Sequence, residues 1–472
     1  MKQSLWTVDE IVSATGGSVR GKPGDASGIS IDSRTVEPGD LFIAIKGDQF
    51  DGHAFVDAAL EAGAAAALVS ADQADALKVP KAGLIVVDDS YDGLYDLARA
   101  ARARAAGTML AITGSVGKTS TKETFRLILS AFGKTHAPVK SFNNHWGVPL
   151  TLCRMPRDTD YGVFEIGMNH SGEITPLSKL VQPHVAMITT VAPVHLENLG
   201  SLDAIAAAKA EIFDGLLEGG TAVVHGDIDH SDFLKERAIA SGAGKVMTFG
   251  HGAGSDAELM QVALLPDCST VEAKISYKTM TYKVGAPGEH LVVNSLGVLA
   301  VCSALGLDLA KAGMALANME QPDGRGRKHV IDTPGDAITL LDESYNANPA
   351  SVKAALKVLS RLPTGQRGRR IAVLGDMLEL GDEASAMHGA LVYDLTALGV
   401  DKVYACGPLM KALWRVLPME KRGAYAESSD GLRDPLLSDL APGDAVMIKG
   451  SLGSKMGPLV ELILQRYKDR ER

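Results

Sequence analysis

Cysteine is scarce in this sequence: four cysteines occur among 472 residues. They lie far apart at positions 153, 268, 302 and 406, and no pair has C-x-x-C spacing. This pattern offers neither a disulfide framework nor a cysteine-based metal site. It is typical of a protein kept in a reducing compartment, so we expect the protein to be cytoplasmic.

The chain also lacks long hydrophobic runs and an excess of positive charge. Asp9 and Glu10 interrupt the apolar pattern of the N-terminus before a signal peptide could form. No apolar run approaches the ~18 residues of a membrane-spanning helix, so we expect no membrane span. The formal net charge of −10 argues against a general binder of nucleic acid or anionic membranes.

What the chain does have is length and a regular alternation of strand and helix patterns. A chain of 472 residues predicts three domains at roughly 150 residues each. After Gly107, short strands such as TMLAIT, YGVFEIG and HVAMITT alternate with helices, which predicts a parallel sheet with helices on its faces. The strands AITLLDE, RIAVLGD, KVYACG and AVMIKG repeat this style after a polar break near 321–329. We place three α/β domains at 1–106, 107–322 and 323–472.

The stretch TGSVGKTSTKE follows a predicted strand and opens a predicted helix, which is the context of a phosphate-binding loop. The common loop, G-x-x-x-x-G-K-[ST], would place its first glycine at Ile112, but the glycine is Gly114. Lys118 would supply a positive charge, and the Thr119 hydroxyl is placed to bind Mg²⁺. The alternative is a glycine-rich turn without function; otherwise the motif predicts nucleotide binding but no particular reaction. The expected nucleotide contacts are Gly114, Ser115, Val116, Gly117, Lys118, Thr119 and Ser120.

Glu165 lies at the end of the predicted strand YGVFEIG, His195 follows the predicted strand HVAMITT, and Lys209 lies in the segment IAAAKAEIF. Ligands of open α/β sheets bind beyond the carboxyl ends of the strands, so Glu165 and His195 could face the loop. Taken singly, Glu165 could be a salt-bridge partner, His195 a loop residue and Lys209 a solvated helix lysine.

Five segments occur in an order that resembles the Mur ligases: TGSVGKTSTKE, FNNHWGVPLT, FEIGMNHSGEI, HLENLGS and AAAKAEIF. These ligases are the ATP-dependent amide-forming enzymes of peptidoglycan synthesis, and their shorter T-G-x-x-G-K-[ST] loop accounts for the displaced glycine. The segments SIDSRTVEPGDLFIAIKGDQFDGHAF, DESYNANPAS and VLGDMLELGDEASAMH narrow the resemblance, which spans essentially the whole chain. They resemble the last ligase of the series, which joins D-alanyl-D-alanine to UDP-N-acetylmuramoyl tripeptide. The resemblance implies a central P-loop parallel-sheet domain between a small N-terminal α/β domain and a C-terminal Rossmann-like α/β domain.

The resemblance also implies a catalytic centre. Thr119 and Glu165 would hold the Mg²⁺ that bridges the ATP phosphates. His195 would hold a second metal ion, although Mg²⁺ prefers oxygen ligands. Lys209 would be carbamylated by CO₂, which turns a cation into an anionic oxygen ligand. The expected catalytic residues are Lys118, Lys209, His195 and Arg325.

Further ATP contacts are implied in the last third of the chain. Arg325 matches the arginine near the γ-phosphate, although Arg327 competes because the local DGRGRKH repeat leaves the register open. Asp342 and Glu343 both qualify as the ribose contact. His290 and Asn294 match the helix on the adenine side, or they are simply a helix entry.

The remaining expectations concern the other two substrates. Ser33 and Arg34 match the UDP-binding DSR segment of the family. The loop KGDQFDGH, residues 46–53, matches a second UDP-binding segment. Lys449 and Ser451 end a predicted strand where the dipeptide carboxylate could dock. Asn348 is either a ligand or simply the N-cap before Pro349. The full set of expected substrate contacts is Ser33, Arg34, Lys46, Gly47, Asp51, Gly52, His53, Asn143, Asn144, Asn346, Asn348, Lys449 and Ser451.

The function implied is ligation through an acyl phosphate, giving the UDP-muramoyl pentapeptide, ADP and phosphate. The expected partners are UDP-N-acetylmuramoyl tripeptide and D-alanyl-D-alanine, with no nucleic acid, and we expect a monomer. The third residue of the tripeptide, lysine or diaminopimelate, stays open. The alternatives are another Mur ligase or a folylpolyglutamate-type ligase. A different class, a P-loop kinase or nucleotide-driven binding module, would hydrolyse or transfer phosphate without forming an amide.

Overall fold

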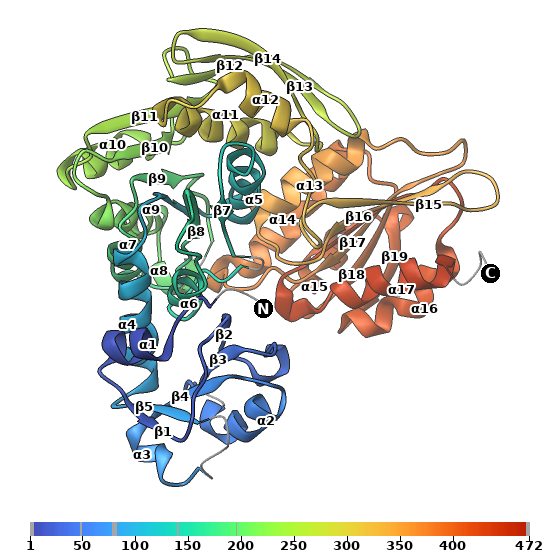
Figure 1. Ribbon diagram of the computed structural model, residues 1–472. Coiled ribbons are helices and arrows are strands. Elements are labelled where there is room, and N and C mark those ends of the chain that lie inside the picture. Colours follow the sequence, from blue (N-terminus) through green and yellow to red (C-terminus); the bar gives the residue numbers. More distant parts are fainter. Residues whose placement is uncertain (1–3, 48–49, 78–82, 139–140, 195, 469–472) are drawn as a thin grey trace.

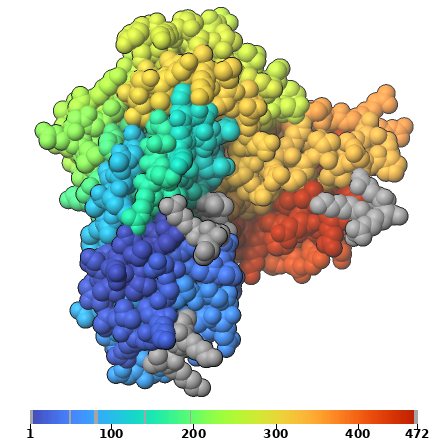
Figure 2. Space-filling model, viewed as in Figure 1, coloured from blue at the N-terminus to red at the C-terminus, as the bar shows by residue number. Residues whose placement is uncertain are grey.

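The structure is a computed structural model, which describes residues 4–47, 50–77, 83–138, 141–194 and 196–468. Three sheets follow one another along the chain, as the resemblance implied (Figure 1). In the space-filling view the N-terminal part is blue, the central part green to yellow and the C-terminal part orange to red (Figure 2). Within the described residues, no helix is both long and apolar enough to span a bilayer.

The first sheet has the order β1-β5-β4-β3-β2, with β1 antiparallel to β5 and the other pairs parallel. This N-terminal part is fixed to the central part by side chains that reach backbone carbonyls across the boundary. Trp6 Nε1 donates to the carbonyl of Cys153 (2.9 Å), and Arg154 Nε donates to that of Ile29 (2.7 Å). Its elements are α1 (Val8–Thr15), β1 (Ser18–Arg20), β2 (Gly28–Ser30), β3 (Asp40–Ile43), α2 (Val56–Glu61), β4 (Ala66–Ser70), α3 (Ala71–Ala74), β5 (Leu84–Val87) and α4 (Ser90–Ala103).

The second sheet has the order β14-β13-β12-β11-β10-β9-β6-β8-β7. The predicted parallel arrangement is confirmed from β7 to β12. Its elements are β6 (Thr108–Thr113), α5 (Lys118–Leu129), β7 (Thr135–His136), α6 (Gly147–Cys153), β8 (Tyr161–Glu165), α7 (Ile174–Val181), β9 (Val185–Ile188), α8 (Leu196–Leu199), α9 (Leu202–Ala210), β10 (Thr221–His225), α10 (Ser231–Ala240), β11 (Lys245–Gly250), β12 (Ala257–Leu264), β13 (Ser269–Ile275), β14 (Lys278–Val284), α11 (Glu289–Ala304) and α12 (Leu309–Leu316).

The parallel prediction does not extend to β13 and β14, which pair antiparallel. Buried and exposed residues alternate along β13, which is the pattern of an antiparallel strand with one face on the core. Only Ser276 and Tyr277 connect β13 to β14, and Ser276 has a φ of +56°. A connection this short permits a hairpin but not the crossover that a parallel pair requires.

The third sheet has the order β15-β16-β20-β17-β18-β19, with β15 antiparallel and the rest parallel. Helices α13, α14 and α15 contribute to the core on one face, whereas α16 and α17 contribute to the core on the other. Its elements are β15 (Arg327–Ile331), β16 (Ile338–Glu343), α13 (Pro349–Arg361), β17 (Arg370–Gly375), α14 (Ala384–Ala397), β18 (Lys402–Cys406), α15 (Lys411–Val416), β19 (Arg422–Ala426), α16 (Arg433–Asp439), β20 (Ala445–Lys449) and α17 (Gly457–Lys468).

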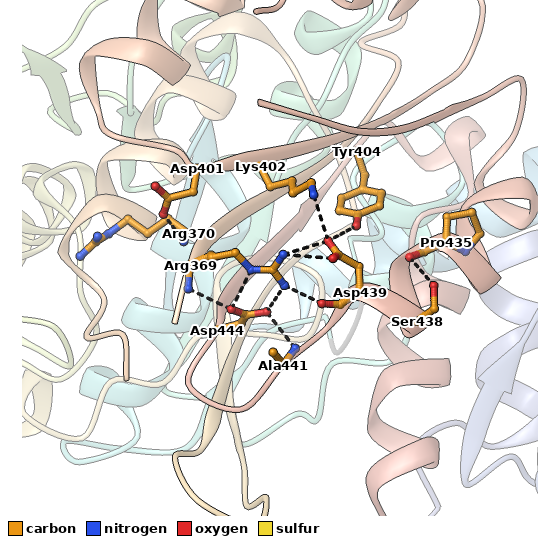
Figure 3. A network of polar contacts seen from close by, with 10 residues as sticks. All are labelled: Arg369, Arg370, Asp401, Lys402, Tyr404, Pro435, Ser438, Asp439, Ala441 and Asp444. Carbon is orange, nitrogen blue, oxygen red and sulfur yellow. Dashed lines mark hydrogen bonds and ion pairs between the residues drawn. The ribbon is translucent and has the colours of Figure 1, made fainter. Parts of the chain in front are cut away.

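A polar network ties together the starting ends of β17, β18 and β20 (Figure 3). Arg369 donates to both carboxylate oxygens of Asp444, which is fully buried, and also to Asp439. Tyr404 donates to Asp439 as well. Parallel strands all start at one edge, so this network lies at the edge opposite the carboxyl ends of these strands.

Candidate active site

A cavity of about 630 Å³ lies between the central and C-terminal parts of the chain. Its walls come from the β6–α5 loop, the carboxyl ends of β8 and β9, the start of α11, the end of β16 and helix α13. The structure brings many of the predicted residues to this one cavity. Those that line it are Ser115, Val116, Gly117, Lys118, Ser120, Asn143, Glu165, His290, Asn294, Arg325, Glu343, Asn346, Asn348 and Lys449.

The position of the first loop glycine has a steric cause. Gly114 has a φ of +149°, and a Cβ there would lie 1.9 Å from Oγ1 of Thr189, just past the end of β9. Thr189 Oγ1 also donates to the carbonyl of Val116 (2.6 Å), which holds the loop against this strand end. Gly117 has a φ of +85°, and a Cβ there would lie 2.5 Å from Nδ2 of Asn294. The loop therefore needs glycine at both positions, and it leads directly into the N-terminus of α5, where free N–H groups favour an anion.

Lys118 is the first residue of α5, and its Nζ donates to the carbonyl of Gly114 (2.5 Å). Burial lowers the pKa of Lys118; the Glu165 carboxylate opposes this shift and the Arg325 guanidinium adds to it. Two cations and one carboxylate therefore surround the cavity near the loop. An anionic ligand such as a phosphate group would complete this set of charges.

The Glu165 carboxylate ends β8 and is almost fully buried, at 1% exposure. Thr119 Oγ1 donates to its Oε2, and Asn143 Nδ2 donates to its Oε1, both across 2.8 Å. Ser141 Oγ lies 3.1 Å from Thr119 Oγ1 and accepts a hydrogen bond from Arg325 (3.1 Å). One chain of contacts thus connects β8, the phosphate loop and the C-terminal part.

The oxygen atoms of Thr119 and Glu165 fit the ligand preference of Mg²⁺. In the described part of the chain, no three His, Cys, Asp or Glu side chains gather into a metal site of their own. A Mg²⁺ here would therefore take its other ligands from water and from the phosphates of a bound nucleotide, as is common for this ion. His195, expected to hold a second metal ion, lies outside the described residues.

Lys209 near the end of α9 is 2% exposed, although the sequence pattern alone favoured a solvated lysine. None of the hydrogen bonds or ion pairs within the described residues involves its ammonium group. Burial lowers the pKa of Lys209 well below its ordinary value, and the charge of Lys118 lowers it further. Both effects favour the neutral amine, which is the form of lysine that reacts with CO₂.

The structure distinguishes the members of the two ambiguous pairs. Arg325 lines the cavity with its guanidinium 4.2 Å from the Tyr345 ring centroid, whereas Arg327 pairs with Asp323. Glu343 lines the cavity, where Lys449 Nζ lies 3.0 Å from its Oε2.

Asp342, in contrast, accepts hydrogen bonds from the backbone N–H groups of Gly324 and Ser344. Asp342 does not line the cavity, and its carboxylate holds the backbone of Gly324, next to Arg325. Asn348 caps α13 before Pro349, as predicted, and lines the cavity as well, so neither interpretation of Asn348 excludes the other.

Two residues expected to contact substrate have their side chains engaged within the protein. Asn144 accepts the N–H of Gly147 (2.9 Å) at the start of α6. Ser451 accepts the N–H of Leu378 (2.9 Å) and is buried at 4% exposure. Each is close in sequence to a residue that lines the cavity, Asn143 or Lys449, but neither lines it itself.

The residues expected to bind UDP lie in the N-terminal part, away from the cavity. Arg34 is highly exposed and pairs with Asp32. His53 is buried, with Nδ1 2.6 Å from the Asp51 carboxylate and Nε2 accepting the N–H of Ser70. Ser33 begins a short helical turn, and the backbone of Lys46 forms an isolated antiparallel β-bridge with that of Asp51. Gly47 and Gly52 lie in the same loop.

Several cavity residues were missed by sequence reasoning. Thr189 lies at the end of the predicted strand HVAMITT, so the strand-end rule that found Glu165 could also have found it. Tyr345 lies in the DESYNANPAS segment, so the resemblance could have found it as well. Ser141 carried no signal, because a serine in a loop has many possible roles. The additional lining residues with polar or charged side chains are Ser141, Asn169, Thr189, Thr190, His225, His251, Glu289, Gln321, Tyr345, Ser351, Lys353, Lys357 and Arg361.

Each of the three parts of the chain matches a protein-family model. Residues 25–102 match the description "Mur ligase family, catalytic domain", 112–302 the "Mur ligase middle domain", and 326–452 the "Mur ligase, glutamate ligase domain". The UDP-N-acetylmuramoyl-tripeptide–D-alanyl-D-alanine ligase of Escherichia coli is 35% identical over 410 residues, 86% of this chain and 87% of the relative.

Solved structures agree with the sequence relatives. A crystal structure of MurF from Acinetobacter baumannii has a TM-score of 0.84 and 31% identity, and the match covers 98% of this chain and 99% of that one. MurF from Thermotoga maritima, solved in complex with ADP, has a TM-score of 0.76 and 26% identity, covering 94% and 98%. The similarity extends along nearly the whole chain at identities of about a third and includes the three sheets and the phosphate loop, so this chain belongs to the Mur ligase family.

Proposed function

We propose that this protein joins D-alanyl-D-alanine to UDP-N-acetylmuramoyl tripeptide, with ATP converted to ADP and phosphate. The observation that carries the proposal is the near-full-length similarity to enzymes of that name, combined with the cavity where Lys118, Glu165 and Arg325 meet. The ADP bound in the Thermotoga maritima structure supports the nucleotide assignment. A folylpolyglutamate-type ligase is not supported by these relatives.

The reaction begins at the terminal carboxylate of the tripeptide, which attacks the γ-phosphorus of ATP. ADP leaves, and an acyl phosphate forms. The dipeptide amine attacks the acyl carbon, phosphate leaves the tetrahedral intermediate, and the amine loses a proton as the amide forms. A carboxylate needs this activation because it is a poor electrophile. Lys118, Arg325 and the N–H groups at the start of α5 would hold the transferring phosphoryl group and stabilise its charge.

Mg²⁺ bound by Thr119 and Glu165 would neutralise phosphate charge and align the reactants. For Lys209, burial and the lowered pKa support carbamylation: nitrogen bonds to the carbon of CO₂, a proton leaves, and a carbamate anion remains. That anion would offset the nearby charge of Lys118, whereas a protonated Lys209 would add to it. His195 completes the proposed metal ligands by family resemblance.

The remaining residues divide between two substrate sites and the nucleotide. Residues 1–106 would bind the UDP end through the loops around Arg34 and Lys46, residues 107–322 would bind ATP, and residues 323–472 would close over it and bind the dipeptide. His290, Asn294 and Glu343 would contact the nucleoside, and Lys449, which lines the cavity, would contact the dipeptide carboxylate. We propose that the protein is monomeric and cytoplasmic. Its four unpaired cysteines are consistent with a reducing compartment.

The decisive experiment is a coupled assay with UDP-muramoyl tripeptide, ATP and D-alanyl-D-alanine. We expect phosphate release only when all three are present, with a UDP-pentapeptide as product. Phosphate release without the dipeptide would instead support a nucleotide-hydrolysing protein. Efficient use of a single amino acid in place of the dipeptide would support another Mur ligase.

A further inference from the structure

A groove of about 850 Å³ runs along β14, the edge strand of the second sheet. Six consecutive residues of β14, 278–283, form one wall, and residues 306–310 together with α12 form the other. Figure 1 shows β14 and α12 in the outer part of the central region. No residue lines both this groove and the cavity described above, so the groove is a separate feature of the surface.

The backbone of β14 is paired on one side only. Within the described residues, β13 is the one strand that pairs with it. Every second residue of an antiparallel edge strand turns its N–H and C=O groups away from the partner strand. Just past β14, the N–H of Gly285 donates to the carbonyl of Leu316 (2.9 Å), which ties this end to α12. The outward groups along the groove are left for an added strand.

The side chains of the groove leave apolar surface exposed. Met280 and Tyr282 point to the inner face of the sheet, where α12 comes close: a Cβ on Gly313 would lie 2.7 Å from Cε of Met280. Leu309 is only partly buried, and Met314 is 67% exposed. Apolar side chains gathered at one exposed groove are typical of a contact surface.

The groove also carries uncompensated positive charge. Lys278 and Lys283 are the first and last residues of the β14 wall, and within the described residues neither makes an ion pair or a side-chain hydrogen bond. The one acidic residue of the lining, Asp308, caps α12 by accepting the N–H groups of Ala310 and Lys311. The chain as a whole has a net charge of −10, so this local excess of lysine favours an acidic ligand.

The same lysines disfavour a second copy of this chain as the occupant. Lysine on an edge strand commonly prevents two sheets from pairing edge to edge, and a second β14 would bring the same two lysines. An acidic strand meets no such repulsion. At about 3.3 Å per residue, the six-residue wall is about 20 Å long, which is the length of a short peptide strand.

We propose that this groove binds an acidic, extended peptide segment of a partner protein, which adds to β14 as an antiparallel strand. Hydrogen bonds to the strand edge would give affinity, and alternate side chains would give specificity. The first and sixth peptide residues would lie opposite Lys283 and Lys278 and would be acidic. The second and fourth would lie opposite Tyr282 and Met280, on the side of α12, and would be apolar.

The test measures binding of labelled peptides to the full-length protein by fluorescence anisotropy. The probe is Glu-Val-Thr-Val-Thr-Glu, and the control Val-Val-Glu-Thr-Thr-Glu has the same composition without the alternation. We expect the control to bind at least about tenfold more weakly, because a strand in the wrong register turns its side chains to the wrong face. N-methylation of both valines and N-methylation of both threonines block opposite edges of the peptide, so only one of them should abolish binding.

A charge reversal tests the two lysines. Lys278→Glu combined with Lys283→Glu should weaken binding of the probe about tenfold or more and should favour Lys-Val-Thr-Val-Thr-Lys instead. Lys22→Glu combined with Lys245→Glu is the matched control, because it changes the net charge equally at two other exposed lysines. The control should bind the probe as wild type does. Both double variants should keep wild-type ligation, since none of the four lysines lines the cavity.

Several results would overturn the proposal. One is the absence of probe binding up to about 1 mM. Equal affinity for the probe and its control peptide would show attraction by charge alone, as would equal losses in the two double variants. Binding that survives both N-methylations would exclude strand addition. A wild-type dimer in light scattering that the Lys278 and Lys283 reversal dissociates would make a second copy of this chain the occupant.

Discussion

The hydroxyl of Thr119 donates to the carboxylate of Glu165 across 2.8 Å, joining the phosphate loop to the end of the neighbouring strand β8. The two residues are 46 positions apart in the sequence, and the parallel pairing of β6 with β8 brings them together. The Glu165 carboxylate lines the cavity, and the Thr119 hydroxyl contacts it from the first turn of α5. The pair is therefore the simplest place to test how this protein handles Mg²⁺ and phosphate.

Glu165→Gln keeps the shape of the side chain and removes its charge. We expect the ligation rate to fall by about 100-fold or more, because Mg²⁺ loses its anionic protein ligand while Thr119 keeps a hydrogen-bond partner. Raising the Mg²⁺ concentration should recover part of the loss. The measurement is the rate of phosphate release against Mg²⁺ concentration; an unchanged Mg²⁺ dependence would argue against Glu165 as a ligand.

Gly114→Ala should weaken ADP binding about tenfold or more, because its Cβ would fall 1.9 Å from Thr189 Oγ1 at a φ of +149°. The double variant Gly114→Ala with Thr189→Ala should regain part of the affinity, since that oxygen is gone. Gly172→Ala is the matched control: Gly172 has a φ of +87° and nothing within 4 Å of the position of its Cβ. It should cost about 1–2 kcal/mol of stability through backbone strain and leave ADP binding unchanged.

The phosphate loop and Glu165 were predictable because strand, loop and helix follow one another in the sequence, and strand ends share one edge of a parallel sheet. Asn144 and Ser451 show where such reasoning stops. A residue type that can cap a helix or bond a backbone N–H can equally bind a ligand, and only the three-dimensional contacts reveal which role is in use. The burial of Lys209 was likewise invisible, because an alanine-rich helix gives no polar face to contrast with it.

Lys118→Ala should abolish ligation and leave binding of the UDP-tripeptide within about twofold of wild type. Lys118 faces the nucleotide cavity, whereas the residues expected to bind UDP lie in the N-terminal part. Ligation is measured by product formation, and UDP-tripeptide binding by calorimetry without ATP. Equal loss of both activities would contradict this division between the two parts of the chain.

Lys209→Met should abolish ligation and yet raise the stability of the ligand-free protein in CO₂-free buffer by about 1–3 kcal/mol. The pKa of Lys209 is lowered on folding, so the unfolded chain binds the extra proton. Below the ordinary lysine pKa near 10.5, the stability of the wild type therefore falls as pH falls, until the folded pKa is reached. Methionine removes this pH-dependent loss. Urea unfolding of both proteins at several pH values measures the difference, and parallel curves would show that Lys209 does not titrate on folding.

Arg369→Met should destabilise the C-terminal part by about 3–5 kcal/mol, because it leaves the fully buried Asp444 carboxylate without its cation. Burial alone would raise the pKa of Asp439, but hydrogen bonds from Tyr404 and Arg369 outweigh it and lower that pKa below its usual 3.8. The Asp439 contribution is thus present above pH ~4 and lost as pH falls through the lowered value. Arg433→Met, which breaks an exposed pair with Asp430, should cost less than about 1 kcal/mol. Equal urea midpoints for the two variants would show that the network in Figure 3 contributes no more than a surface ion pair.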